Sequence, residues 1–240
     1  MANLFIDVGN TAIKYSIGTD RLEHSRDNVI RTSAFNEITE QLHLVSRIYI
    51  SSVRSSVALD DFRAQCSQLQ KSLFIAETKS YERGLHNAYH QPSNMGIDRW
   101  LAMLAARNQS NKEGLVVIDI GTAVTIDFIV NQQHLGGWIG PGFNLMKNAL
   151  FNNTEKVFGN DNENTEIYFG NDTPDCVDFG CKAQIIGMGK HAVELISTKS
   201  SEFDVFITGG NQNIFKYEDF FSTAFFSENL VLDGLTLFVD

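Results

Sequence analysis

The fold is decided near the start of the chain, by the stretch Leu4-Phe5-Ile6-Asp7-Val8-Gly9-Asn10-Thr11-Ala12-Ile13-Lys14. This stretch predicts an apolar strand, a carboxylate at the end of that strand, a tight turn and a second strand that carries a lysine. An aspartate beside a buried strand has to be hydrogen-bonded, paired with a charge or linked to a metal. Gly9 lets a ligand approach the backbone, and successive N–H groups in such a turn bind anions. With the hydroxyl of Thr11 and the charge of Lys14, the stretch predicts a phosphate-binding hairpin.

The same pattern returns about halfway along, in Leu115-Val116-Val117-Ile118-Asp119-Ile120-Gly121-Thr122-Ala123-Val124-Thr125. For one copy alone, a hairpin with an Asp-capped turn and no ligand is the simpler interpretation. Two copies with the same spacing instead favour a duplicated unit, with one nucleotide bound between the two halves.

The composition indicates a globular protein and excludes several classes of partner. Hydrophobic residues make up 43% of the 240 residues, and the formal net charge is −10. No cluster of Lys and Arg offsets this acidity, which argues against binding to nucleic acid. No apolar run approaches the length of a membrane span, and Asp7 interrupts any signal-peptide core. Because the three cysteines include no C-x-x-C pair, we expect a reducing compartment and a cytoplasmic protein.

Strands and helices alternate after the first hairpin, which predicts an α/β layer fold. The expected elements are a helix over 35–44, a strand over 47–53, a helix over 57–69 and a strand over 72–76. The polar segment 109–114 is the predicted link between an N-terminal domain, 1–110, and a C-terminal domain, 111–240.

The segment 79–97 is predicted to be a loop, and a helix follows it. His86 and His90 have the spacing of two metal ligands on a helix, but solvated loop histidines are the better interpretation. Gly96-Ile97-Asp98-Arg99 opens a helix that runs to about Asn108. The helix dipole favours an ionised carboxylate at Asp98 in the first turn, and a simple helix cap is the alternative.

The second half contains a glycine pattern that resembles a dinucleotide-binding motif, Ile185-Ile186-Gly187-Met188-Gly189-Lys190-His191-Ala192. That motif requires a preceding strand. Apolar residues instead recur at helical spacing through the glycines: Val177, Cys181, Ile185, Met188, Ala192 and Leu195. We therefore predict one long helix whose glycines allow close packing.

Three further segments complete the second half. Residues 136–142 predict a short strand followed by a turn rich in Gly and Pro, and residues 152–175 predict an irregular segment. The strand that begins at Phe203 is expected to end in the Gly209-Gly210 turn, where a ligand could lie against bare backbone.

Four motifs, in the same order, resemble those of type III pantothenate kinases. They are Asp7-Val8-Gly9-Asn10-Thr11 with Lys14, Gly96-Ile97-Asp98-Arg99, Asp119-Ile120-Gly121-Thr122-Ala123 and Gly136-Gly137-Trp138-Ile139-x-Pro141-Gly142. Ser51-Ser52-Val53 and Leu230-x-Leu232-Asp233-Gly234-Leu235 are also similar. The resemblance implies two ribonuclease-H-like domains of the actin and sugar-kinase type, with a nucleotide cleft between them. It also implies ATP-dependent phosphorylation of pantothenate to 4′-phosphopantothenate, the first step of coenzyme A biosynthesis.

The resemblance also implies roles for single residues. Asp98 would be the catalytic proton acceptor, Asp119 would help to hold a monovalent cation (K⁺ or NH₄⁺), and Asp7 would reach Mg²⁺ through water. The ATP-binding residues would be Asp7, Val8, Gly9, Asn10, Thr11, Ala12, Ile13, Lys14 and Thr122. The substrate-binding residues would be Tyr89, Gly96, Ile97, Asp98, Arg99 and Thr173. The family is dimeric, and the partner subunit completes the substrate pocket.

Three alternatives remain open at this point. The nearest is another small-molecule kinase of the same fold, which would act on a sugar or a carboxylate. A non-catalytic nucleotide-binding regulatory protein is the second, although the net charge is wrong for DNA contact and no recognition helix stands out. The presence of Asp98 and Arg99 together favours catalysis over mere binding. A nicotinamide enzyme is the third, and it rests only on the glycine pattern at 185–192.

Overall fold

The computed structural model describes residues 2–18, 29–153 and 167–239. Within it the chain forms two compact units. The first consists of Met1–Gln109 together with Asn229–Asp240, and the second of Ser110–Glu228. Within these described ranges, no helix is both long enough and apolar enough to cross a membrane.

The last segment of the chain groups with the first unit, whereas the sequence assigned all of 111–240 to the second domain. The reason is the packing of α7 (Leu230–Thr236) against α3 (Ile97–Gln109) and β1 (Ala2–Val8). At Gly234 the two helices are so close that a Cβ atom would lie 2.3 Å from the carbonyl oxygen of Leu101.

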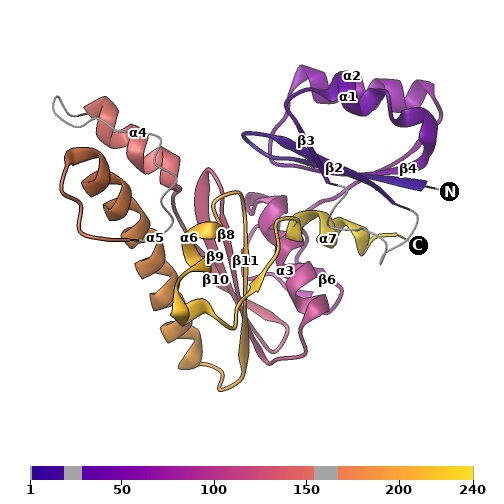
Figure 1. The fold of residues 1–240 in the computed structure, drawn as a ribbon. Coiled ribbons are helices and arrows are strands. Elements are labelled where there is room, and N and C mark those ends of the chain that lie inside the picture. The colour runs from indigo at the N-terminus through magenta and orange to yellow at the C-terminus, as the bar shows by residue number, and fades with distance from the viewer. Residues whose placement is uncertain (1, 19–28, 154–166, 240) are drawn as a thin grey trace. The chain divides into compact units, whose positions relative to one another are not determined.

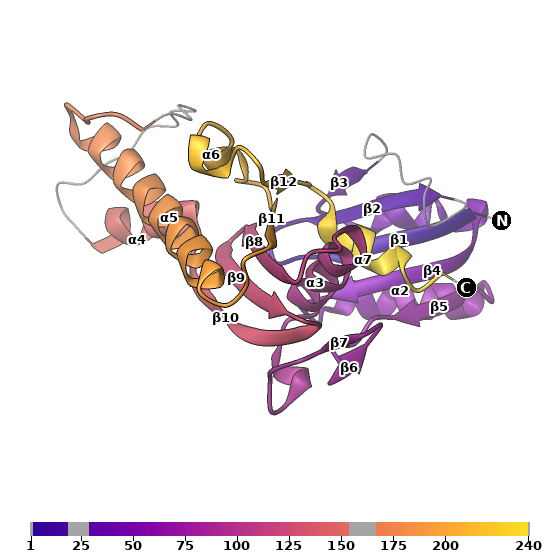
Figure 2. The same cartoon turned by 90° about the horizontal axis from the view of Figure 1, so that it is seen from below.

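The sheet of the first unit combines an antiparallel meander with parallel strands. β1 pairs in antiparallel fashion with β2 (Ile13–Gly18), and β2 pairs likewise with β3 (Ile30–Thr32). β4 (Val45–Ser52) runs parallel to β1, and β5 (Ser72–Ile75) runs parallel to β4. The order is therefore β3-β2-β1-β4-β5, which can be followed in Figure 2.

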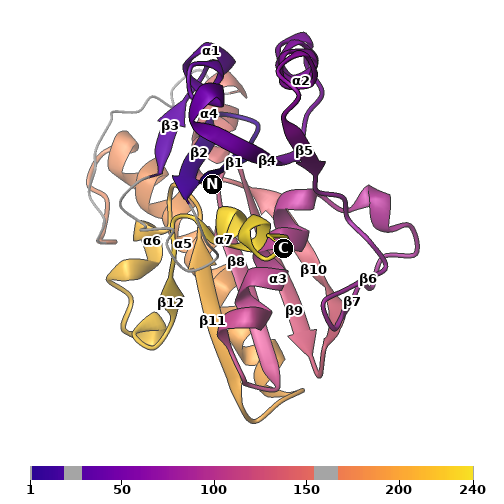
Figure 3. The same ribbon diagram turned by 90° about the vertical axis from the view of Figure 1, so that its right-hand side faces the viewer.

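The helices of the first unit cover both faces of this sheet. α1 (Phe35–Thr39), a 3-10 turn (Leu42–Leu44) and α2 (Val57–Gln68) lie on one face, as Figure 3 shows. The helix predicted over 35–44 is interrupted, because α1 ends at Thr39 and a separate 3-10 turn begins at Leu42.

The sequence predicted a loop over residues 79–97, but the structure contains regular elements in this segment. β6 (Tyr81–Glu82) and β7 (Leu85–His86) form a hairpin, and a 3-10 turn follows at Pro92–Asn94. Arg83 and Gly84 connect the two strands with φ values of 48° and 87°. Positive φ at both central residues defines the turn that suits a two-residue hairpin.

Alternation along β1 decides which side chains meet which helices. Leu4, Ile6 and Val8 pack into the core beneath α1 and α2, so the odd-numbered residues face the other way. On that opposite face Phe5 stacks on Tyr49 of β4, with ring centroids 5.0 Å apart. Asp7 shares this face, toward which α3 and α7 pack.

The second unit repeats the strand order of the first. β8 (Gly114–Ile120), β9 (Ala123–Val130) and β10 (Gln133–Pro141) form an antiparallel meander. β11 (Phe203–Thr208) is parallel to β8, and β12 (Phe225–Phe226) is parallel to β11. The order β10-β9-β8-β11-β12 matches β3-β2-β1-β4-β5 strand for strand, in agreement with a duplicated unit. β10 continues through Pro141, where the sequence predicted a turn.

The helices of the second unit are α4 (Phe143–Asn153), α5 (Thr173–Ser197) and α6 (Asn213–Lys216), followed by a 3-10 turn at Asp219–Phe221. Figure 1 shows α5 along one face of the sheet, and its Ile185 and Ile186 belong to the same buried core as Val116 and Ile118. Of the predicted irregular segment, residues 154–166 lie outside the described residues, and 167–172 carry no regular element.

The prediction of one long helix through the glycine pattern is confirmed, and this excludes a dinucleotide fingerprint because no strand precedes the glycines. The expected close packing holds at Gly189, where a Cβ atom would lie 2.5 Å from the Phe215 ring. It does not hold at Gly187, where no atom of the described residues would lie within 4 Å of an added Cβ. Leu195, expected on the apolar face, is 38% exposed.

Candidate active site

The first predicted site element is the β1–β2 hairpin, which places Asp7 directly opposite Lys14. The backbone N–H of Gly9 donates to the carbonyl of Ala12 at 3.1 Å and closes the turn. Asn10 and Thr11 lie exposed at its tip. The side chains of Val8 and Ile13, by contrast, are fully buried. Those two residues therefore offer a ligand only their backbone groups.

Asp7 is held from a second side by β4. The parallel register pairs Asp7 with Ser51, and the Ser51 hydroxyl donates to Oδ1 of Asp7 at 2.8 Å. Burial raises the pKa of Asp7, and the Ser51 hydrogen bond and the charge of Lys14 lower it. With a smaller upward effect from the carboxylate of Asp98, the resulting pKa is about 6. Asp7, Lys14 and Asp98 thus form one electrostatic group within the first unit.

Asp98 lies in the first turn of α3, as the sequence predicted. Its Oδ1 accepts a hydrogen bond from the backbone N–H of Arg99 at 2.8 Å. A Cβ atom at Gly96 would lie 2.5 Å from the same oxygen, so a larger residue there would displace the Asp98 side chain. The carboxylate therefore does contact the start of its own helix, and a capping role is compatible with a catalytic one.

Arg99 and Tyr89, two of the predicted substrate-binding residues, lie in contact. Nη1 of Arg99 donates to the Tyr89 hydroxyl at 2.9 Å, and the guanidinium carbon lies 5.7 Å from the centre of the ring. Arg99 is only 6% exposed. A buried guanidinium presents a planar set of donors that suits a carboxylate.

The corresponding turn of the second unit follows β8. Asp119 pairs with Thr125 of β9, and the N–H of Gly121 donates to the carbonyl of Ala123 at 2.9 Å. Thr122 is exposed at the tip.

Two glycines from elsewhere in the second unit pack against this turn. A Cβ atom at Gly142 would lie 2.2 Å from the carbonyl oxygen of Gly121, and one at Gly209 would lie 2.4 Å from Oδ1 of Asp119. The turn is therefore fixed by close backbone contacts.

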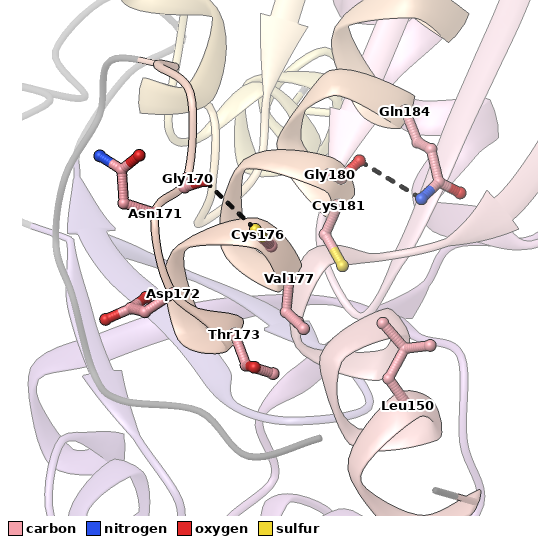
Figure 4. A pocket seen from close by; sticks show the side chains of 10 residues that line it. All are labelled: Leu150, Gly170, Asn171, Asp172, Thr173, Cys176, Val177, Gly180, Cys181 and Gln184. Atoms are coloured by element: carbon pink, nitrogen blue, oxygen red, sulfur yellow. Dashed lines mark hydrogen bonds between the residues drawn. The ribbon is translucent and has the colours of Figure 1, made fainter. Parts of the chain in front are cut away.

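Thr173 lies elsewhere in the second unit, at the first residue of α5. It lines a pocket of about 540 Å³ that neither Asp119 nor Thr122 lines. Figure 4 shows it beside Asp172, whose carboxylate accepts from the N–H of Asp175 at 3.0 Å and caps the helix.

Comparison with known proteins identifies the family. The family model for type III pantothenate kinase matches residues 3–194. The chain belongs to the type III pantothenate kinase family. It is 36% identical over 234 residues to the type III pantothenate kinase of Pseudoalteromonas atlantica, an alignment that covers 97% of this chain and 95% of the relative. The type III pantothenate kinase of Hahella chejuensis is 32% identical, and the alignment covers 99% of this chain and 97% of that relative.

Solved structures agree on the fold of this type III pantothenate kinase family member. A conserved protein from Campylobacter jejuni, assigned to the Baf family of transcriptional activators, superposes with a TM-score of 0.61 at 22% identity, covering 98% of this chain and 96% of its own. Lmo2764 of Listeria monocytogenes, assigned as an N-acetylmannosamine kinase, superposes with a TM-score of 0.54 at 12% identity. The superposition covers 99% of this chain and 98% of Lmo2764. The predicted α/β fold with two ribonuclease-H-like units of the sugar-kinase type is confirmed.

The sequence did not predict that Ser51 contacts Asp7, or that Gly142 and Gly209 pack against the turn that carries Asp119. Ser51 could have been found from its position. It lies at the end of the strand that follows a predicted helix, and Asp7 lies at the end of its own strand in the same way. The glycines stood in segments recognised as turns, but which backbone they approach depends on the tertiary fold.

Proposed function

We propose that this chain phosphorylates pantothenate with ATP to give 4′-phosphopantothenate, the first step of coenzyme A biosynthesis. The observation that carries the proposal is the grouping of Asp7, Lys14 and Asp98 in the first unit of a chain that belongs to the type III pantothenate kinase family. Phosphoryl transfer asks a protein mainly to position groups and to neutralise charge, and this group contains both acids and a cation.

On the acceptor side, Asp98 would align the pantothenate hydroxyl and take its proton as the new bond to phosphorus forms. Arg99, held by the Tyr89 hydroxyl, would bind the pantothenate carboxylate through two parallel N–H groups. Gly96 and Ile97 would shape the pocket through their backbone. Thr173 would contact the substrate from the start of α5.

On the nucleotide side, the backbone of the Gly9–Ala12 turn and the hydroxyl of Thr11 would bind phosphate oxygens, with Lys14 adding charge. Thr122, exposed at the tip of the other turn, would supply a further hydroxyl.

The residues present fit a hydrated Mg²⁺ ion. No group of three His, Cys, Asp or Glu side chains in the described ranges is arranged to hold a metal. Kinases, however, bind Mg²⁺ through one or two carboxylates, phosphates and water, and Asp7 would supply the carboxylate through water. Bound Mg²⁺ would neutralise the charge that develops on the phosphates.

The Asp119 turn fits a monovalent cation, K⁺ or NH₄⁺. It brings a carboxylate together with backbone carbonyl oxygens, the donors that K⁺ accepts in proteins. The use of bound cations suits an acidic chain, because they supply positive charge that the sequence lacks.

The active form is proposed to be a cytoplasmic homodimer whose partner subunit completes the pantothenate pocket. Large apolar side chains stand exposed around α4 and the start of α5, with Leu145 at 49%, Leu150 at 39% and Phe169 at 97%, as at surfaces that associate. All three cysteines are free thiols, which supports a reducing compartment.

The test is an ATP-dependent assay with pantothenate against a panel of sugars and small carboxylic acids, run with K⁺, with NH₄⁺ and with Na⁺ only. We expect phosphorylation of pantothenate alone, and only with K⁺ or NH₄⁺. Transfer to a sugar instead would favour the alternative of another kinase of this fold. ATP binding with no transfer to any acceptor would favour a regulatory protein. Full activity in Na⁺ alone would contradict the role of Asp119.

A further inference from the structure

A second pocket of about 320 Å³ lies at one edge of the sheet in the first unit. The residues that line it include Ser52 at the end of β4, Arg54 and Ser55 in the next loop, Leu59 and Arg63 on α2, and Ala76 after β5. β1, β4 and β5 are parallel, so their carboxyl ends meet at this edge. In open α/β sheets, ligands bind outside these carboxyl ends.

The charge of this pocket is positive, although the whole chain carries −10. Among the described residues that line it, the ionisable side chains are Arg54 and Arg63, and neither Asp nor Glu occurs. Arg63 does contact Asp60, with Nη1 and Oδ1 3.5 Å apart, but the Asp60 side chain is 69% exposed. Such an exposed pair screens the guanidinium only weakly.

Both arginines also have hydrogen-bonding capacity that the protein leaves unused. The Nε atoms of Arg54 and Arg63 are shielded from solvent, and neither has an acceptor among the described residues. Unsatisfied buried donors are costly, most of all when they are charged. A turn of each guanidinium toward the pocket would let an oxyanion accept from Nε and a terminal N–H, which would satisfy both side chains.

The pocket also adjoins the proposed phosphate hairpin. Nη1 of Arg54 donates to the carbonyl of Asn10 at 3.4 Å, a long bond to the tip of that turn. The backbone N–H of Val53, in the same loop, donates to the carbonyl of Val8 at 3.2 Å. An anion held by Arg54 would therefore be one side chain away from the backbone of the hairpin.

We propose that Arg54 and Arg63 form a binding site for the phosphate group of a small anionic ligand. Neither arginine belongs to the ATP-binding or substrate-binding residues assigned above, so the proposal extends the function beyond them. Phosphate is favoured over a carboxylate because two guanidinium groups match its double charge and its several acceptor oxygens. The phosphate belongs either to the bound nucleotide or to a separate phosphorylated molecule.

The test is a calorimetric titration of the full chain with pyrophosphate, without pantothenate, so that its outcome does not depend on the proposed kinase activity. The variants are Arg54→Gln, Arg63→Gln and both together. The matched control is Arg47→Gln, an exposed arginine near the other end of β4. Denaturant unfolding without ligand checks that each variant is folded.

We expect wild type and Arg47→Gln to bind pyrophosphate equally, and each pocket variant to bind about tenfold or more weakly, the loss expected for a charge-assisted hydrogen-bond pair. Absence of binding to wild type, or equal binding to the folded double variant, would overturn the proposal. A further variant, Lys14→Gln, tests the hairpin. If it loses pyrophosphate binding while the arginine variants keep it, the anion binds at the hairpin and the proposal is overturned.

A second titration in saturating unhydrolysable ATP analogue identifies the source of the phosphate. Loss of pyrophosphate binding by wild type in the presence of the analogue would assign the site to the nucleotide's own phosphates. Undiminished pyrophosphate binding would assign it to a separate phosphorylated molecule. Either result supports the site itself.

Discussion

Asp7 carries a free-energy cost that its neighbours offset only in part. Burial raises its pKa from 3.8 to about 6, despite the Ser51 hydrogen bond and the charge of Lys14. Between these two values the folded protein binds a proton that the unfolded chain has already lost. The free energy of unfolding therefore falls, through this group, as the pH rises from about 4 to about 6, and the cost stays constant above that.

Asp7→Asn should remove this cost. We expect the variant to be more stable than wild type above pH 6, by on the order of 1 kcal/mol. The gain should shrink as the pH falls from about 6 to about 4. Urea denaturation in metal-free buffer at a series of pH values measures the difference. A variant that is less stable than wild type at pH 7.5, or a difference in stability that does not change with pH, would contradict the raised pKa of Asp7.

At the scale of single elements, α5 contains a matched pair of glycines. Gly187 has open space around its Cα, whereas a Cβ atom at Gly189 would collide with Phe215. We expect Gly187→Ala to stabilise the protein by about 0.5–1 kcal/mol through helix propensity. Gly189→Ala should destabilise it by about 1–3 kcal/mol through overpacking. Denaturant midpoints measure both changes, and equal effects would contradict the described packing.

The turn after β8 provides another prediction at this scale. Gly142→Ala would place a Cβ atom 2.2 Å from the Gly121 carbonyl oxygen, so the turn that carries Asp119 and Thr122 must move. We expect kcat/KM for ATP to fall by about tenfold or more, because small displacements of positioning groups are costly in catalysis. Gly210→Ala is the control, because the added Cβ meets no atom within 4 Å in the part of the chain that the structure describes. An unchanged kcat/KM in folded Gly142→Ala would show that the turn does not bind the nucleotide.

Elements with a local signal were predictable from the sequence. Both Asp-containing hairpins and the long helix α5 follow from apolar periodicity and turn residues. The β6–β7 hairpin was not predicted, because its turn places Arg83 at positive φ, where an arginine gives no signal. The grouping of α7 with the first unit depends on contacts with α3 that no local pattern contains.

For the whole molecule, duplication is the feature that the sequence conveyed best. Two Asp-X-Gly patterns predicted two similar units, and each unit has the same strand order. The pairing of Asp7 with Lys14 followed from the hairpin. The contact between Asp7 and Ser51 did not, because 44 residues separate them and only the parallel register of β1 and β4 brings them together. The arginine pocket was missed for the same reason, since its residues come from β4, α2 and β5.

The most direct test of the account compares wild type with Asp98→Asn for transfer of phosphate from ATP to pantothenate, with ATP affinity measured in parallel. We predict that wild type forms 4′-phosphopantothenate and that the variant binds ATP equally well but turns over about 10²-fold more slowly or worse. Equal turnover by a folded Asp98→Asn variant would contradict the assignment of Asp98 as the proton acceptor. Absence of product from wild type would contradict the proposed reaction itself.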